Sequence, residues 1–153
     1  MSLKIKFNSN KDDILILFLK VARAVVAPAF FNWTESTINE ELEISKIISL
    51  YDEQLHEYMA FICYRESDEL IDIMALGAHP QYTRMGHMKR LLSQLLAHSR
   101  EASKEVLLEV HEHNVPAIEL YNRMGFQKIS FRPSYYQDGR GAFIYKWANE
   151  LQY

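Results

Sequence analysis

The sequence predicts a mixed α/β (α+β) fold, in which helices flank a mostly antiparallel sheet. Apolar residues recur at helical spacing in some stretches, and elsewhere short runs rich in Ile, Tyr, Phe and Leu are bounded by charged turns. Between residues 70 and 110 a strand pattern, a helix pattern and a second strand pattern follow one another. Because such a crossover connects parallel strands, part of the sheet is expected to be parallel.

Each element is predicted by a local pattern. A helix is expected over residues 14–31, and Thr34 is expected to open a second, short helix. Later, a helix should begin around Gly86, and another should run from an Asn114 N-cap to Gly125 as the residue after its end. Strands are predicted at residues 44–51, 58–66, 70–78, 106–111, 127–132 and 142–147.

The bulk properties predict one soluble domain that covers residues 1–153. Hydrophobic residues make up 48% of the chain and charged residues 24%, as is usual for a globular protein. A net charge of -3 provides no basic surface for nucleic acid, and no apolar run is long enough to span a membrane. We therefore expect a cytoplasmic protein without a nucleic-acid or membrane partner. The single cysteine, Cys63, excludes an internal disulfide bond and is expected to be a buried hydrophobic residue.

The junction between the strand that ends near Ala78 and the helix that follows resembles an anion-binding site. A loop that leads into a helix presents unpaired main-chain N–H groups at the positive end of the helix dipole, which suits a phosphate or diphosphate. Gly86 would let such a ligand approach the main chain, and Arg84, Lys89 and Arg90 add positive charge. An ordinary helix entry has the same appearance, and neither GxxxxGK nor GxGxxG is present.

Three motifs resemble the GNAT acetyltransferases. "HPQYTRMGHMKRLL" is similar to the acyl-CoA-binding segment of that family, and "LLEVHEHNVPAIELYNRMGF" is similar to its LeuGluVal…Asn-x-x-Ala-x-x-Leu-Tyr-x-x-x-Gly-Phe run. "FRPSYY" resembles the Arg-x-x-Tyr-Tyr segment of the bacterial ribosomal-protein N-terminal alanine acetyltransferases, and "FNWTES" resembles their Trp-containing substrate loop. The resemblance covers about residues 70–147.

The resemblance implies a GNAT-like fold with a splayed central pair of parallel strands, and acetyl-CoA as the cosubstrate. It implies that the coenzyme diphosphate meets the main chain of the loop and that the pantetheine arm pairs with the end of the preceding strand. The coenzyme-binding residues implied in this way are Leu76, Ala78, Arg84, Met85, Gly86, His87, Met88, Lys89 and Asn114. Thr83 and Met88 depart from the family pattern, because Arg or Gln and a small residue are usual there, and weaker or shifted coenzyme binding could follow.

The resemblance also assigns an acid and a tyrosine. Acetyl transfer to an amine needs a base for the amine proton and a proton donor for the leaving thiolate. Glu109 and Tyr121 match the glutamate and the tyrosine of the alanine acetyltransferases. From the residues alone, Glu109 could equally be an outward-facing strand residue and Tyr121 a core residue of an amphipathic helix.

The acceptor is predicted to be a peptide or protein N-terminus. An α-amine with a reference pKa of about 7.8 is roughly 15% neutral at pH 7, whereas a lysine amine with a pKa of about 10.4 is roughly 0.04% neutral. A single weak base such as Glu109 therefore deprotonates an N-terminus more easily, without excluding a lysine or a small amine. The aromatic residues that could wall a peptide groove, or simply belong to a sheet edge, are Phe31, Trp33, Tyr135 and Tyr136.

Two alternatives remain open on the sequence. Thr83 and Met88 motivate a catalytically degenerate module that binds acyl-CoA without turnover. His111 and His113 invite a metal site, but no HExxH spacing or partner cysteine supports one, so no metal is predicted.

Overall fold

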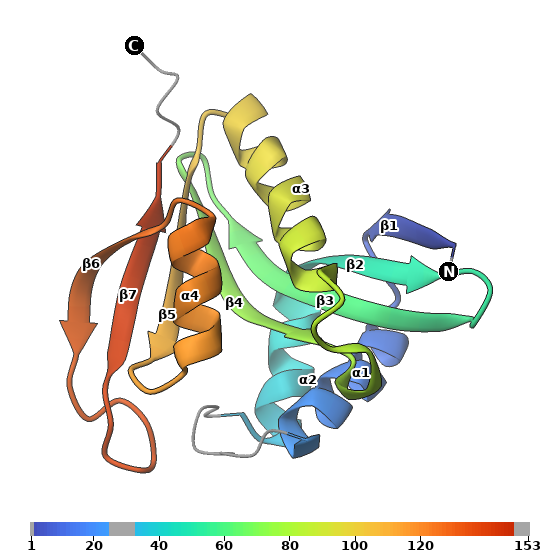
Figure 1. Cartoon of the computed structure of the whole chain (residues 1–153), viewed down its shortest axis with the longest axis horizontal. Helices are drawn as coiled ribbons and strands as arrows, with labels where there is room; N and C mark the ends of the chain where they lie inside the picture. The colour runs from blue at the N-terminus through green and yellow to red at the C-terminus, as the bar shows by residue number, and fades with distance from the viewer. Residues whose placement is uncertain (1, 25–32, 149–153) are drawn as a thin grey trace.

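The computed structural model describes residues 2–24 and 33–148, and Figure 1 shows their arrangement. The α-helices are α1 (Lys11–Ala24), α2 (Glu35–Ile44), α3 (His87–Glu101) and α4 (Val115–Arg123), and a short 3-10 helix, η2, covers Pro80–Tyr82. The strands are β1 (Leu3–Phe7), β2 (Lys46–Asp52), β3 (Glu57–Glu66), β4 (Leu70–Ala78), β5 (Glu105–His111), β6 (Gln127–Arg132) and β7 (Ala142–Trp147).

All seven strands belong to one sheet, in the order β1-β2-β3-β4-β5-β7-β6. Strands β4 and β5, at the centre, are parallel and are joined by α3 as the crossover helix. Each of the other neighbouring pairs is antiparallel. The predicted mixed, mostly antiparallel sheet with a parallel pair is therefore confirmed.

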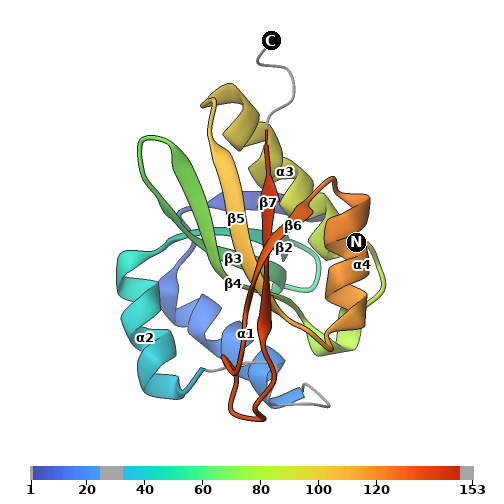
Figure 2. The same ribbon diagram turned by 90° about the vertical axis from the view of Figure 1, so that its left-hand side faces the viewer.

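Different helices cover the two faces of the sheet (Figure 2). Helices α1 and α2 pack on one face, where their apolar side chains meet Phe61, Cys63 and Ala75. Helices α3 and α4 pack on the other face, in a larger core that includes Leu91 and Tyr121. Cys63 is fully buried, and burial raises the pKa of its thiol to about 12, with a further contribution from the charge of Glu41. The thiol is therefore an unreactive hydrophobic group, as the sequence indicates.

The beginning of the chain differs from the prediction in two ways. Helix α1 begins at Lys11 rather than at residue 14, because the Asn10 side chain accepts hydrogen bonds from the main-chain N–H groups of Asp12 and Asp13 at 2.9 and 3.3 Å. Strand β1 is absent from the predicted order of elements. It pairs with β2, and its alternating apolar side chains lie against the larger core. Residues 25–32 of the predicted first helix lie outside the described residues.

A β-bulge interrupts β4 at Met74. On β3, Cys63 pairs with Ala75 and Tyr64 pairs with Ile73, so Met74 is the extra residue between two paired ones. Because side chains alternate along a strand, the extra residue reverses which face the following side chains point to. Ile73 packs in the larger core, whereas Ala75 packs in the core under α1 and α2.

The two central strands separate at this bulge. The parallel pairing ends at Ile73 and Leu108, although β4 continues to Ala78 and β5 to His111. The unpaired halves of the two strands diverge, which is the splayed pair that the resemblance implies. One side of β4 therefore carries main-chain groups that are not hydrogen-bonded to β5.

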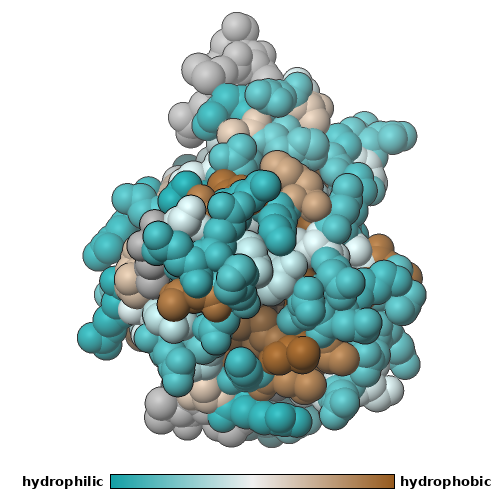
Figure 3. Space-filling view, turned by 90° about the vertical axis from the view of Figure 1, so that its right-hand side faces the viewer, coloured by the Kyte–Doolittle hydropathy of each residue, from teal (hydrophilic) through white to brown (hydrophobic). Residues whose placement is uncertain are grey.

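The end of the sheet that carries the free edge of β1 is polar. Lys4 and Lys6 are on this edge strand, and the Lys6 ammonium lies 3.8 Å from the centroid of the Tyr51 ring. Figure 3 shows this side of the molecule, which is mostly hydrophilic with an apolar area below its centre. Lysines on an edge strand oppose pairing with another sheet. None of the described helices combines the length and the apolar character that crossing a bilayer requires.

An ion cluster around Glu66 ties the start of β2 and the end of β3 to α3. The Glu66 carboxylate is 7% exposed and accepts hydrogen bonds from Lys46, His98 and Lys104 at 3.1, 3.0 and 2.8 Å. Burial alone would raise the pKa of Glu66, but the hydrogen bonds from Lys104, Lys46 and His98 outweigh it and lower the pKa to about 2. Folding therefore favours the ionised carboxylate.

Replacing Glu66 by glutamine is expected to lower the free energy of unfolding at pH 7 by about 1–3 kcal/mol, since hydrogen bonds to a charged group are lost. Because folding lowers the pKa, this stabilisation is present above the ordinary pKa of 4.5 and is lost as the pH falls from there towards about 2. The free energies of unfolding of wild type and Glu66→Gln, measured by urea unfolding between pH 7 and pH 2, should converge at low pH. Glu53→Gln, which removes an exposed pair with Lys4, serves as the control. A difference in the free energy of unfolding between wild type and Glu66→Gln that stays constant across this pH range would contradict the role assigned to Glu66.

Candidate active site

A cleft opens where β4 and β5 separate. We call it the β4–β5 cleft, and its volume is about 520 Å³. Both strands, the start of α4, the start of α2 and the loop between β6 and β7 contribute to its wall. The residues that line it are Trp33, Thr37, Asp72, Ile73, Met74, Ala75, Leu76, Leu108, Glu109, Val110, His111, Asn114, Ala117, Tyr121, Arg132, Tyr135 and Tyr136.

Glu109 reaches this cleft from β5. Its side chain is 31% exposed, and its Oε1 lies 3.1 Å from a guanidinium nitrogen of Arg132 on β6. The Tyr135 hydroxyl also hydrogen-bonds to the Glu109 carboxylate. Glu109 is therefore held in place at the cleft wall by these two contacts, rather than being a free surface residue.

Tyr121 reaches the same cleft from α4. The residue is 4% exposed, and its ring packs against the rings of Phe126 and Tyr145 with centroid distances of 5.7 and 6.3 Å. Burial, with a smaller contribution from Tyr136, raises the pKa of the Tyr121 hydroxyl. The hydroxyl is thus protonated throughout the neutral pH range and remains a proton donor. Tyr121 is thus both a core residue and a cleft residue, because its ring belongs to the core while the residue also lines the cleft.

The loop between β6 and β7 covers part of the cleft and is held by the end of β5. His111 is 1% exposed, and its Nδ1 accepts a hydrogen bond from the main-chain N–H of His113 at 3.0 Å. The proton is therefore on Nε2, which donates to the Asp138 carboxylate at 2.8 Å. The His111 ring also lies 4.7 Å from the ring of Tyr136. These contacts engage both nitrogens of His111 and position Tyr136.

The structure gathers most of the predicted acceptor residues at this cleft. Trp33 lines it from the α2 side, and its ring packs edge-on against Phe18 at 5.5 Å. Tyr135 and Tyr136 line it from the loop, with their rings 5.0 Å apart and nearly perpendicular. Phe31 lies outside the described residues.

The loop before α3 has the features of an anion site. Arg84 and Gly86 both have positive φ angles, of 63° and 77°, and the space where a Cβ of Gly86 would lie is open. Within the described part of the chain, none of the main-chain N–H groups of residues 84–89 donates a hydrogen bond to another atom of the protein. A run of free N–H groups at the positive end of a 15-residue helix fits a diphosphate.

The side chains of this loop divide between solvent and core. Arg84, Met85 and Lys89 are exposed, whereas His87 is 4% exposed and its pKa is lowered by burial and by Arg90. The Met88 side chain is partly buried and packs against the larger core. The departure from the family pattern at Met88 is therefore accommodated in the core.

Three further predicted coenzyme residues lie at the cleft or beside it. Leu76 and Ala78 are on the unpaired half of β4 and pack against the larger core, and Leu76 also lines the cleft. Asn114 lines the cleft as the N-cap of α4, with its side chain accepting a hydrogen bond from the Ala117 N–H. Ala78 and residues 84–89 do not line the cleft itself. The cleft, the end of β4 at Ala78 and the loop of residues 84–89 follow one another along the chain, which is the order expected for an extended ligand.

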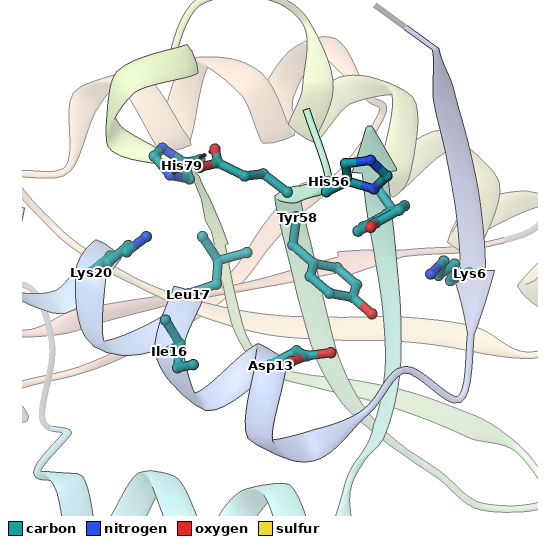
Figure 4. Close-up of a pocket in the computed structure, with 10 residues that line it drawn as sticks. Lys6, Asp13, Ile16, Leu17, Lys20, His56, Tyr58 and His79 are labelled. Carbon is teal, nitrogen blue, oxygen red and sulfur yellow. Dashed lines mark ion pairs between the residues drawn. The ribbon is translucent and has the colours of Figure 1, made fainter. Parts of the chain in front are cut away.

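A second cavity, of about 380 Å³, lies between α1 and the β1 end of the sheet (Figure 4). His79 and Glu57 face each other in its wall with 3.6 Å between Nε2 and Oε2, and burial lowers the pKa of His79. Lys6 and Lys20 balance the charges of Asp13 and Glu57 there. The cavity contains neither Glu109 nor Tyr121, so it is separate from the β4–β5 cleft.

Sequence reasoning assigned no role to two charged residues of the cleft. Arg132 belongs to the "FRPSYY" motif, but the motif alone does not indicate that Arg132 pairs with Glu109. Asp72 carried no local signal, because its position near Glu109 depends on the pairing of β4 with β5, in which Asp72 lies beside Leu107. Among the described residues, no group of three or more His, Cys, Asp or Glu side chains is arranged to hold a metal ion.

Comparison with known proteins identifies the family. Residues 19–126 match the acetyltransferase (GNAT) family. The chain belongs to this family. This GNAT acetyltransferase is 29% identical to the [ribosomal protein bS18]-alanine N-acetyltransferase of Haemophilus ducreyi over 105 residues, which cover 68% of this chain and 72% of that protein.

Two further comparisons cover the acetyltransferase to different extents. An N-alpha-acetyltransferase of Sulfurisphaera tokodaii is 34% identical over 74 residues, which make up 47% of this chain and 44% of that protein. The match therefore spans less than half the length of that relative. The crystal structure of the ribosomal-protein-S18-alanine N-acetyltransferase from Escherichia coli superposes with a TM-score of 0.78 at 24% identity, covers 99% of both chains and has the same fold.

Replacing Gly86 by alanine is expected to weaken acetyl-CoA binding to this GNAT protein about tenfold, which corresponds to about 1.4 kcal/mol. The added Cβ would occupy open space beside the free N–H groups and strain a residue with φ of 77°. Isothermal titration calorimetry measures the affinity. Gly139→Ala is the matched control, since Gly139 has φ of 81° and equally open surroundings but lies in the β6–β7 loop. Equal loss of affinity in both variants would contradict a coenzyme role for the α3 end.

Proposed function

We propose that the protein transfers the acetyl group of acetyl-CoA directly to the N-terminal α-amine of a protein or peptide, of the ribosomal-protein alanine type. The observation that carries the proposal is the position of Glu109 and Tyr121, which line one cleft from two different elements. A carboxylate that accepts a proton and a phenol that donates one are sufficient for this reaction, and no nucleophilic side chain is needed. The unreactive Cys63 is consistent with direct transfer.

The residues present fit acetyl-CoA along one path. The free N–H groups of residues 84–89 would bind its diphosphate, and the unpaired main chain of β4 near Leu76 and Ala78 would pair with its pantetheine arm. When bound, acetyl-CoA supplies the activated acetyl thioester. Tyr121 would stand at the sulfur, and Glu109 would face the acceptor amine.

The acceptor class is supported by the chemistry of the base. The difference between an α-amine and a lysine amine, about 2.6 pKa units, corresponds to about 3.5 kcal/mol of deprotonation at 1.36 kcal/mol per unit. A carboxylate in an open cleft has limited power to offset that difference. The aromatic walls from Trp33, Tyr135 and Tyr136 suit the first residues of a peptide.

The names of two relatives support the same class of acceptor. The Haemophilus ducreyi protein is a ribosomal-protein alanine acetyltransferase and the Sulfurisphaera tokodaii protein is an N-alpha-acetyltransferase. Arg132 and the two tyrosines that follow it belong to a motif that the alanine acetyltransferases share, and all three line the cleft here.

A peptide library with varied N-terminal residues tests this proposal directly. The protein is incubated with acetyl-CoA and each peptide, thiol release gives the rate, and mass spectrometry locates the acetyl group. We expect acetylation of the α-amine, with alanine among the preferred first residues. Acetylation of a lysine side chain with a free N-terminus would favour the lysine or small-amine reading instead. Acetyl-CoA binding without any turnover would support a degenerate binding module.

A further inference from the structure

Asp72 places a second carboxylate in the β4–β5 cleft. Asp72 lies on β4, one residue before the end of the parallel pairing, and Glu109 lies on β5, one residue after it. Given the spacing of paired strands, their Cα atoms are roughly 8 Å apart. Both side chains line the cleft, so a single ammonium group in the cleft is within reach of both.

The two carboxylates differ in their partners. Glu109 is paired with Arg132 at 3.1 Å and accepts a hydrogen bond from Tyr135. Within the described part of the chain, no cationic side chain lies within 4.0 Å of the Asp72 carboxylate. The nearest strand neighbour with a positive charge, Arg65, donates two hydrogen bonds to Glu41, at 2.9 and 2.7 Å. Asp72 is therefore the carboxylate that is open to a cationic ligand.

The surroundings of Asp72 strengthen it as a base. Its pKa is raised by burial and by the charge of Glu109, and the charge of Glu41 adds to this while Arg65 opposes it. Among the described residues Tyr135 also faces it, and burial and the two carboxylates raise the pKa of that hydroxyl. A carboxylate in this environment gains stability from a bound cation or from a proton.

We propose that Asp72 is a catalytic residue of the acceptor site, which receives the acceptor amine as an ammonium ion between Asp72 and Glu109 and takes its first proton. This inference rests on the proposed function. The neutral nitrogen then bonds to the acetyl carbon and loses its second proton to Glu109. The C–S bond breaks, its electron pair stays with sulfur, and sulfur takes the Tyr121 proton. One proton returns from the carboxylates to Tyr121 and the other is released to solvent, so the step balances.

The inference specifies the acceptor further. Two carboxylates and one paired arginine leave the cleft with a net negative charge, which selects amines that arrive protonated. An N-terminus with a pKa of about 7.8 is mostly protonated at pH 6 and more than 90% neutral at about pH 9. The need for Asp72 should therefore disappear as the pH rises.

The test compares Asp72→Asn, Asp72→Glu and wild type between pH 6 and pH 9, using the best peptide of the library. We expect Asp72→Asn to lower kcat/KM about 100-fold at pH 6 and only severalfold at pH 9. Asp72→Glu should keep the wild-type pH dependence. Glu69→Gln, an exposed acid just before β4, should match wild type at both pH values. Calorimetry should give the same acetyl-CoA affinity for all four proteins.

A loss of activity in Asp72→Asn that is constant across the pH range, or no loss, would overturn the role of Asp72. If wild type acetylates a lysine or a small amine instead of any N-terminus, the proposed acceptor is wrong, and the same comparison with that amine still decides the role of Asp72. If wild type acetylates no amine, both proposals fail. Thermal unfolding of Asp72→Asn checks its folding independently of activity.

Discussion

Replacing Tyr121 by phenylalanine is expected to lower kcat about 100-fold or more and to leave the affinity for acetyl-CoA unchanged, since a general acid contributes about 10²–10⁴ in rate. The substitution removes one hydroxyl and keeps the ring, which is 4% exposed and packs against Phe126 and Tyr145. The leaving thiolate then lacks its proton donor. Initial rates of thiol release give kcat, and calorimetry gives the affinity for acetyl-CoA.

The neighbouring tyrosines provide the controls for this experiment. Tyr145 is equally buried and its ring lies 6.3 Å from that of Tyr121, but it does not line the cleft, so Tyr145→Phe should retain kcat within about twofold. Tyr136 lines the cleft close to Tyr121, and Tyr136→Phe tests whether it can replace the donor. Unchanged turnover in Tyr121→Phe, with normal turnover in the Tyr121→Phe/Tyr136→Phe double variant, would remove both hydroxyls from the mechanism.

The elements of the fold that have strong local patterns could be predicted from the sequence. Asn114 caps α4 through its side chain, Gly125 has a φ of 92° after the helix, and the stripe of leucines in α3 is buried, as their spacing indicates. Strands β4, β6 and β7 have the predicted bounds. In each case the residues near one another in sequence determine the structure, through a cap, a turn or a periodic apolar face.

The cleft itself could be predicted only through the family resemblance. It forms because Met74 bulges out of β4, and "IDIMALGA" has no glycine or proline at that position to signal a bulge. The approach of Asp72 to Glu109, and the ion pair of Arg132 with Glu109, likewise depend on strands that are distant in sequence. Strand β1 was missed for the same reason, since its five residues are held by β2.

The bulge would allow one cleft to serve the two proposed ligands. Before Met74 the β4 side chains on the α3 side are the core residues Ile71 and Ile73, and after it they are Leu76 and Ala78. Asp72 thus lies on the α1–α2 side, near Glu41, while Tyr121 reaches the opening from the α4 side. An acceptor and a coenzyme can therefore approach from opposite faces of the sheet and meet where the strands separate.

Replacing Glu109 by glutamine is expected to lower kcat/KM about 100-fold at both pH 6.5 and pH 9, because the attacking nitrogen must lose its second proton even when the acceptor amine is already neutral. The substitution keeps the size of the side chain but removes the negative charge and its pair with Arg132 at 3.1 Å. Arg132 then becomes an uncompensated cation that repels an ammonium ion. The pH dependence of kcat and of KM for the peptide, measured separately, distinguishes the loss of a base from this repulsion.

The double variant Glu109→Gln/Arg132→Gln separates these two contributions. It removes both charges, so KM should return towards the wild-type value while kcat at pH 6.5 stays low. Glu105→Gln is the control on the same strand, because Glu105 pairs with Lys146 outside the cleft, and it should leave both parameters unchanged. If the double variant regains kcat as well, Glu109 acts only by neutralising Arg132. The proton acceptor of the reaction would then be Asp72 alone, because it is the other carboxylate among the described residues that line the cleft.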